Sequence, residues 1–233
     1  MKGTDRRWFV RAILLSLCLL FVLLSSSPPA QAAPSSPLDV LFAQLAKSPG
    51  LFARFHEEKQ IALLVAPLKS DGTVHFDRAK GLARHTLTPS KRSILLNAGT
   101  LTVWDGTKTE VIPLSSQPSL RAFAEAFTMF LAADRVGLEK TFKLDFTGDP
   151  QASWRMKLAP VSPDLKKLVT ELEVAGQGTA LSTLRVTEAS GDVGTTTFSD
   201  VDTAKQYTPA EQAAIFSVPP PASPSPAPSA PRP

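Results

Sequence analysis

The chain has 233 residues, with 25 Lys or Arg, 21 Asp or Glu and one cysteine, Cys18. Four basic residues and one acidic residue lie within the first 11 positions, so the rest of the chain carries a net charge of only +1. A nearly neutral domain excludes nucleic-acid binding that depends on phosphate neutralisation, and one cysteine excludes an internal disulfide and a cysteine-based zinc site.

The first 32 residues have the layout of a signal peptide. Basic residues precede an uncharged apolar run, Ala12 to Leu24, and Ala30-Gln31-Ala32 follows as a cleavage site. The run is too short to span a bilayer as a helix. Leu17 stands before Cys18, where acylation of a cysteine usually requires a small residue. We therefore expect cleavage after Ala32, no lipidation, and a periplasmic protein; Arg6-Arg7 leaves the export route open.

The first part of the domain contains one helix and then a series of short strands. Apolar residues at 38, 41, 42 and 45 have helical spacing and predict a helix over 38–47. Strands are predicted at 51–58, 61–68, 73–77, 82–87, 92–96, 101–104 and 109–112. In the third of these, Val74 and Phe76 share one face while Thr73, His75 and Asp77 share the other. This alternation predicts a sheet with one apolar face and one hydrated face.

The strongest helix signal lies in the middle of the chain, over residues 119–133. Its apolar residues recur at helical spacing: Leu120, Phe123, Ala124, Phe127, Phe130 and Leu131. Because the opposite side of this helix is also only weakly polar, we expect it to lie against a large apolar surface.

Further strands and a final short helix follow. Strands are predicted at 142–146, 154–158, 168–174, 181–188 and 195–201. Thr208-Pro209, with Glu211 two residues further on, predicts a capped helix through Ile215. Residues 219–233 contain eight prolines and predict an extended tail. The domain organisation is therefore a signal peptide over 1–32, one domain over 33–218 and a tail over 219–233.

The number of strands predicts the shape of the sheet. A mainly β (α+β) fold with about 10–11 antiparallel strands exceeds the usual sheet size, and such sheets tend to curl. The helix 119–133 is then the element that crosses the concave apolar face. Two interpretations stay open on these residues: a filled core, or a cavity that opens for a ligand.

Several short motifs carry a family resemblance. They are Phe52-x-x-Phe55 with Lys59, Gly72-Thr-Val-x-Phe76-x-Arg78, Gly81-Leu82, and Gly99-Thr-Leu-x-Val-Trp-Asp-Gly106. Together they resemble the periplasmic outer-membrane lipoprotein carrier (LolA) family. The resemblance implies a curved half-barrel with a helical lid, whose cavity shields acyl chains of lipoproteins or other lipids during transfer from the inner to the outer membrane.

The resemblance also implies a set of site residues. The lid residues that bind lipid are Phe123, Phe127, Phe130 and Leu131, and the cavity residues are Phe55, Phe76, Leu82, Trp104, Phe142, Phe146 and Trp154. In the family, an arginine in a strand turn holds the lid closed, and Arg78 matches it. Ala79 stands where the family usually has proline, and Arg84 is a rival for the same role. The alternative for both arginines is a solvated charge at a strand edge.

No pattern for catalysis or cofactor binding is present. The three histidines lie on different predicted strands, so we expect no metal site, and no nucleophile, phosphate-loop or dinucleotide motif occurs. We expect a monomer that is not an enzyme, binds no cofactor and no nucleic acid, and carries a lipidated protein or a lipid. Its partners would be an inner-membrane exporter and an outer-membrane acceptor. The alternative is a periplasmic lipid sensor or envelope scaffold that transports nothing.

Overall fold

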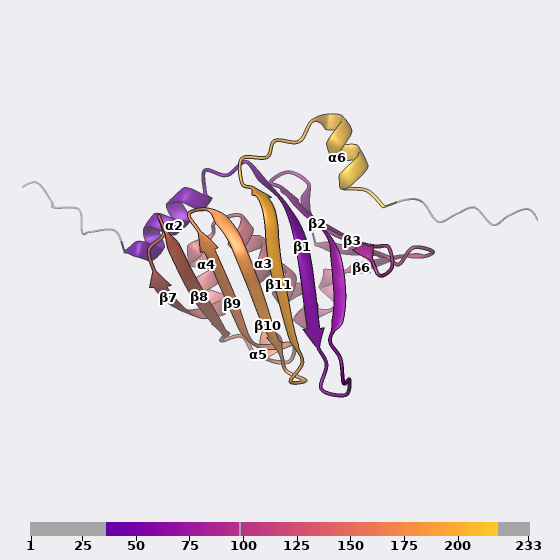
Figure 1. The fold of residues 1–233 in the computed structure, drawn as a ribbon, viewed down its shortest axis with the longest axis horizontal. Helices are drawn as coiled ribbons and strands as arrows, with labels where there is room; N and C mark the ends of the chain where they lie inside the picture. The colour runs from indigo at the N-terminus through magenta and orange to yellow at the C-terminus, as the bar shows by residue number, and fades with distance from the viewer. Residues whose placement is uncertain (1–35, 98, 219–233) are drawn as a thin grey trace, which may run out of the picture. The chain divides into compact units, whose positions relative to one another are not determined.

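The computed structural model describes residues 36–97 and 99–218, and these form one antiparallel sheet of 11 strands with helices on both faces (Figure 1). The strands are β1 (Gly50–Gln60), β2 (Leu68–Asp77), β3 (Gly81–Thr88), β4 (Arg92–Asn97), β5 (Thr100–Trp104), β6 (Thr109–Pro113), β7 (Phe142–Gly148), β8 (Ser153–Pro160), β9 (Val169–Gln177), β10 (Ala180–Glu188) and β11 (Val193–Asp202). The predicted signal peptide and tail lie outside the described residues.

Five α-helices and one 3₁₀ turn accompany the strands in the described part of the chain. They are α2 (Pro37–Leu45), η1 (Leu114–Ser116), α3 (Pro118–Leu131), α4 (Arg135–Thr141), α5 (Pro163–Lys166) and α6 (Pro209–Ile215). Reciprocal hydrogen bonds between Ser36 and Asp39 cap α2, and Thr208 and Glu211 cap α6 in the same way. None of these helices has both the length and the apolar character needed to cross a bilayer.

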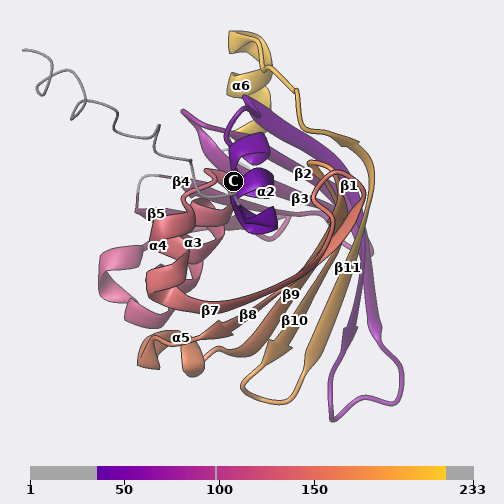
Figure 2. The same ribbon diagram turned by 90° about the vertical axis from the view of Figure 1, so that its left-hand side faces the viewer.

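The sheet consists of two meanders joined side by side. Strands β1 to β6 form one and β7 to β11 the other, and the two meet where β1 pairs with β11, for example Phe55 with Phe198. The sheet curves strongly, with α2, α3 and α4 on its concave side and α6 above the other face (Figure 2). This arrangement confirms the predicted fold: an open, curved, antiparallel sheet with a helix across its concave face.

The main core lies between these helices and the β7–β11 half of the sheet. Its most deeply buried side chains come from the concave faces of the strands and from each covering helix, and include Leu41, Leu138, Phe142, Met156 and Leu165. Because residues on a strand alternate between faces, Trp154, Met156 and Leu158 of β8 enter this core, and so do Leu172 and Val174 of β9.

Several elements differ from the sequence prediction. The predicted strand 61–68 is wrong: residues 61–67 form the loop of the β1–β2 hairpin, and β2 begins only at Leu68. The apolar run resembled a buried strand, but the chain has to reverse after Gln60, and Leu64 N–H donates to Ile61 O within the turn at 2.9 Å. The short helices α4 and α5 were missed because seven and four residues carry too little periodicity to detect.

The hydrated face predicted for β2 is only partly correct. His75 is 8% exposed although it lies on the face opposite Val74 and Phe76. The segment that contains Tyr207 and α6 covers it, so part of this face is a second buried surface.

Candidate functional site

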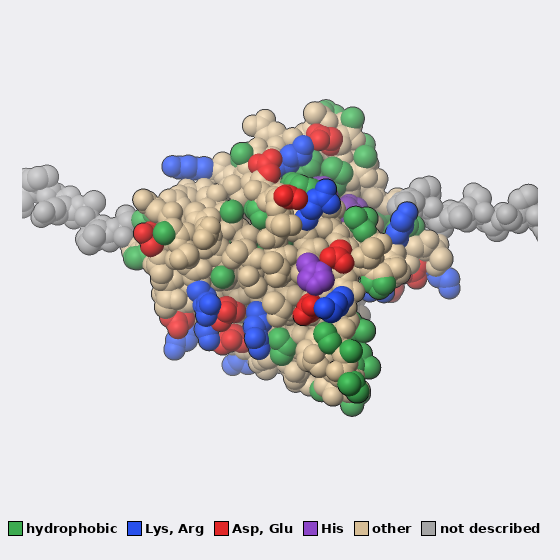
Figure 3. All heavy atoms as spheres, in the orientation of Figure 1, with side chains coloured by type: hydrophobic (Ala, Val, Ile, Leu, Met, Phe, Trp, Pro, Cys, Tyr) green, Lys and Arg blue, Asp and Glu red, His purple; other side chains and the backbone are tan. Residues whose placement is uncertain are grey.

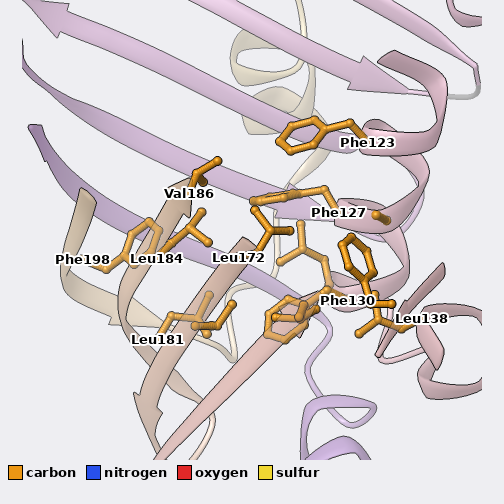
Figure 4. A pocket seen from close by; sticks show the side chains of 14 residues that line it. Phe123, Phe127, Phe130, Leu138, Leu172, Leu181, Leu184, Val186 and Phe198 are labelled. Carbon is orange, nitrogen blue, oxygen red and sulfur yellow. The ribbon is translucent and has the colours of Figure 1, made fainter. Parts of the chain in front are cut away.

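An entirely apolar cavity of about 50 Å³ lies between α3 and the sheet. From the helical side, Phe123, Phe127 and Phe130 point towards the strands (Figure 4). Its other lining residues are Ala126, Leu131, Leu138, Phe142, Leu158, Leu172, Val174, Leu181, Leu184, Val186 and Phe198. The predicted lid residues and Phe142 therefore surround one space.

The volume of this cavity indicates a closed state. Typical ligand sites enclose about 300–1,000 Å³, so a long acyl chain does not fit beside the aromatic rings as they stand. Phe130 is buried and meets Phe42 of α2 edge to face, with 6.4 Å between ring centroids. Phe123 and Phe127 are only half-buried. A ligand of this size would have to displace the rings of α3.

The other predicted cavity residues lie outside this space. Phe76 lines a smaller neighbouring cavity of about 30 Å³ together with Phe130 and Leu131, and it also lines a larger hollow of about 810 Å³ between α3 and β2–β4. Phe55 and Leu82 belong to the apolar cluster under β1 and β2.

The two tryptophans and Phe146 are also placed elsewhere. Phe146 and Trp154 stack on each other at 6.2 Å towards the far end of β7 and β8, and the Trp154 indole N–H donates to Gly178 O at 2.8 Å. Trp104 pairs with Ser93 on the convex side of the sheet, where His85 also lies.

Most residues that line the cavity from the sheet were not predicted from the sequence. Leu172 and Val174 of β9, Leu184 and Val186 of β10, and Phe198 of β11 supply it. Their alternate spacing in the last three strands was the available signal, because residues two apart share a face. The sequence could not show which of the two faces is concave.

Arg78 joins the sheet to the ends of two helices. Its guanidinium donates to the carbonyl oxygens of Ser48 at 2.9 Å and Ala46 at 3.0 Å, just after α2, and to Ala132 O at 3.3 Å, at the end of α3. Carbonyl groups at the C-terminus of a helix lack partners within the helix and carry partial negative charge, so a cation is well placed there.

The turn between β2 and β3 holds Arg78 in this position. Asp77 Oδ1 accepts hydrogen bonds from the backbone N–H groups of Ala79 at 2.8 Å and Lys80 at 3.0 Å. Gly81 then adopts a φ of +88°, and a Cβ there would lie 2.1 Å from Leu96 O. Because the N–H of Ala79 is used, a proline at 79 would lose one of these bonds. The alanine at position 79 therefore supplies a backbone donor that this turn uses.

Arg84 makes none of these lid contacts. It lies on the concave face of β3, where its guanidinium donates to Glu57 Oε2 at 2.5 Å and stacks 4.1 Å from the centre of the Phe55 ring. Both charged side chains are 26% exposed. Arg84 thus forms an ion pair on the concave face of the sheet and a cation–π contact with Phe55.

On the convex face, a hydrogen-bonded cluster fixes α6. Tyr207 donates to Leu51 O at 2.6 Å, so its hydroxyl accepts from Nδ1–H of His75 at 3.2 Å. His85 Nε2–H donates to Ile215 O at the end of α6, at 2.9 Å. Phe216 packs edge to face on Tyr207.

Burial sets the ionisation of this cluster. Loss of solvent, together with nearby His85 and Lys205, lowers the pKa of His75 to about 4. Burial also lowers the pKa of His85 and raises that of Tyr207. All three groups are therefore neutral at pH 7, and the described residues contain no cluster of three or more metal-binding side chains.

Comparisons with known proteins point to one family. A family model described as "outer membrane lipoprotein carrier protein LolA-like" matches residues 30–217. No curated protein sequence matches the chain.

Solved structures give weaker likenesses. The chain is similar to a LolA superfamily protein from Nitrosomonas europaea, with 10% identity, 74% of this chain and 94% of that one covered, and a TM-score of 0.41. It is also similar to a DUF1329 family protein from Desulfovibrio piger, with 8% identity, 77% and 97% covered, and a TM-score of 0.43. Lipoprotein LppX from Mycobacterium tuberculosis is 10% identical over 69% of this chain and 94% of its own, with a TM-score of 0.34.

Proposed function

Because this chain belongs to the outer membrane lipoprotein carrier protein LolA-like family, we propose that it is a periplasmic carrier. It would shield the acyl chains of lipoproteins or other lipids under α3 and move them from the inner to the outer membrane. It would act as a monomer without a cofactor and without chemistry of its own, between an exporter in the inner membrane and an acceptor at the outer membrane.

The observation that carries this proposal is the composition of the cavity. All 14 lining residues are apolar, so an acyl chain would leave no buried polar group without a partner. Each methylene moved from water into such a space contributes about 0.8 kcal/mol. A long acyl chain therefore supplies enough binding free energy without any specific polar contact.

The closed state supplies the means of release. Phe123, Phe127 and Phe130 occupy the space that an acyl chain would need, so the lid and the ligand compete for the same apolar surface. Arg78 adds a bond to the end of α3 that opening has to break. Loading and unloading would then exchange one apolar contact for another, with a small net change in free energy.

The first experiment is native mass spectrometry of the protein purified from the periplasm, with extraction of any bound lipid. A diacyl or triacyl species bound one-to-one supports a carrier and identifies its cargo. Protein that is empty, and that also fails to take up fluorescent acyl probes, contradicts the proposal.

A lid variant tests the competition directly. Phe127 is half-buried, so Phe127→Ala removes a competitor of the ligand at little cost to folding, and the affinity for an acyl probe should rise about tenfold. Leu165→Ala is the matched control, because Leu165 is fully buried in the same core but does not line the cavity, so it should lower stability without raising the affinity for the probe. Equal losses of stability and of probe binding in Phe127→Ala would contradict a displaceable lid.

The small size of the cavity also favours a second function. A nearly filled space between α3 and the β7–β11 half of the sheet is what a non-transporting lipid sensor or envelope scaffold of this fold would have. A larger hollow of about 810 Å³ lies on the other side of α3, towards β2–β4. Transfer of a labelled lipid from donor to acceptor vesicles separates the two, since a sensor or scaffold would bind the probe or a partner without increasing the transfer rate.

A further inference from the structure

The loop of the β1–β2 hairpin exposes an unusual amount of aliphatic surface. Residues 61–68, here called the tip, read Ile-Ala-Leu-Leu-Val-Ala-Pro-Leu and contain no charge. Leu63 and Val65 are 94% and 105% exposed, and Leu64 and Leu68 are also exposed. Figure 3 shows hydrophobic side chains gathered at the lower end of the molecule, where this hairpin lies. Contiguous apolar patches on a protein surface mark contacts with proteins or membranes.

Other exposed aliphatic side chains lie at the same end of the sheet. Gln60 pairs with Val193, and Glu188 pairs with Val169, so the tip, the β10–β11 turn and the α5 segment are at one edge. Figure 1 shows the hairpin and α5 at this lower edge. Three further exposed apolar residues belong to it: Leu87, Val161 and Leu168.

The concave face connects the tip with the apolar cavity. Leu68 lies on the same face of β2 as Val74, directly opposite Lys59. The charged groups between the tip and the cavity are paired: Lys59 with Glu188 at 2.6 Å, and Arg84 with Glu57 at 2.5 Å. Beyond them, Val186 and Phe198 line the cavity. A lipid that moves from the tip to the cavity along β1 and β11 would therefore meet these four charged groups as ion pairs.

The tip is attached to the sheet rather than free. Ala62 N–H donates to Asp192 Oδ1 in the β10–β11 turn at 3.1 Å, and Leu64 N–H donates to Ile61 O at 2.9 Å. These bonds satisfy two backbone donors and hold the aliphatic side chains outward. An exposed loop cannot go deep into hydrocarbon, where every backbone group needs a partner, so the geometry fits shallow contact.

The chemistry of the tip fits a bilayer better than a protein. Interface residues that dominate protein–protein binding are mainly Trp, Tyr and Arg, whereas Leu and Val are under-represented. The tip contains only aliphatic side chains, Ala and Pro, and Leu63 and Val65 project fully without a groove between them. Aliphatic groups that project in this way need only a fluid apolar phase.

We propose that the tip inserts Leu63, Leu64 and Val65 into the surface of a lipid bilayer and so places the cavity end of the sheet against the membrane. The role of this insertion in lipid transfer rests on the proposed carrier function, but the insertion itself requires no bound lipid.

The test is flotation of the exported chain with protein-free vesicles of phosphatidylethanolamine and phosphatidylglycerol. Leu63→Asp combined with Val65→Asp should weaken vesicle binding by about tenfold or more, with an unchanged melting temperature because both side chains are exposed. Leu63→Gln with Val65→Thr should weaken it similarly, which excludes charge repulsion as the cause. Val111→Asp, at an exposed position on edge strand β6, is the matched control and should bind like the parent.

The outcomes separate this proposal from the carrier function. Uptake of an acyl probe from solution should be the same in the tip variants and the parent, whereas uptake from vesicles should fall. Equal vesicle binding by parent and tip variants overturns the tip proposal even if the probe is taken up. Loss of binding only to membranes that contain protein also overturns it, and assigns the tip to a protein partner. Vesicle binding through the tip without any probe uptake supports the tip proposal and contradicts the carrier.

Discussion

Two helices cover the same sheet in different ways. On the concave face, α3 packs with apolar side chains, and in the described part of the chain a single hydrogen bond, from Arg78 to Ala132 O, ties its end to the sheet. On the convex face, α6 has no fully buried residue and is held by hydrogen bonds to Asp77 and His85.

The helices α3 and α6 differ in what can replace them on the surface of the sheet. An apolar contact is non-directional and depends on area, so an acyl chain can substitute for the rings of α3. A hydrogen bond needs a partner of defined geometry, and a lipid chain provides none. A ligand can therefore displace α3 from the concave face, whereas α6 stays fixed on the convex face. The following predictions test that difference, beginning with the largest effect.

The core residues of the sheet beneath α3 should be essential to stability. Phe142→Ala creates a cavity in the core and should lower the free energy of unfolding by about 3–5 kcal/mol. Urea unfolding measures it, and Phe127→Ala in the lid should cost much less. Similar losses in both variants would mean that α3 is part of the core and is not displaceable.

Acid should loosen the α6 side first. The pKa of His75 is about 4 in the folded protein and about 6.5 when unfolded, so the unfolded state binds more protons between these values. The resulting stability is full above pH 6.5 and falls by about 3 kcal/mol as the pH drops towards 4. Urea unfolding at several pH values measures this loss, which His75→Gln should reduce.

Hydrogen exchange locates the acid effect. Between pH 7 and pH 5, after correction for intrinsic exchange rates, protection should fall in α6 more than in α3, whose charged side chains Arg121 and Glu125 are exposed. Loss of protection in α3 before α6 would reverse the comparison.

Removal of the Arg78 contacts should release the lid selectively. Arg78→Ala leaves the carbonyl groups after α2 and α3 to water, and stability should fall by about 1–2 kcal/mol. Faster hydrogen exchange at the end of α3, with unchanged exchange in α6, is the expected signature. Lys80→Ala, in the same turn, is the control and should leave both helices unchanged.

The smallest effect concerns a single bond on the fixed side. Gln212 Nε2–H donates to Asp77 Oδ2 at 3.0 Å. Gln212→Ala should lower stability by about 0.5–1.5 kcal/mol and increase exchange in α6 without changing acyl-probe affinity. A change in probe affinity would show that the two covers are coupled.

Much of the architecture was predictable from local patterns. Alternation in β2 and β8, the caps of α2 and α6, and the helical stripe of α3 each depend on neighbouring residues. The loop 61–67 was mistaken for a strand because its apolar residues resemble those of a buried strand, and no local signal shows that they are exposed.

The residues around the cavity were predictable mainly on its helical side, with Phe142 of β7 the one predicted strand residue that lines it. Phe123, Phe127 and Phe130 follow from the period of α3, whereas the choice of Leu184 or Phe198 over Trp154 depends on which strands lie beneath the helix. The meeting of His75 with His85 depends on the register of β2 and β3, and their burial on where α6 packs.

The sequence by itself determined that the chain forms an antiparallel meander with one strongly apolar helix, because strand and helix periods are properties of successive residues. Only the tertiary structure decided that β1 pairs with β11, that Arg78 reaches the ends of two helices, and that the tip stays uncovered. These features join residues far apart in the chain, and their positions depend on the curvature and register of the whole sheet.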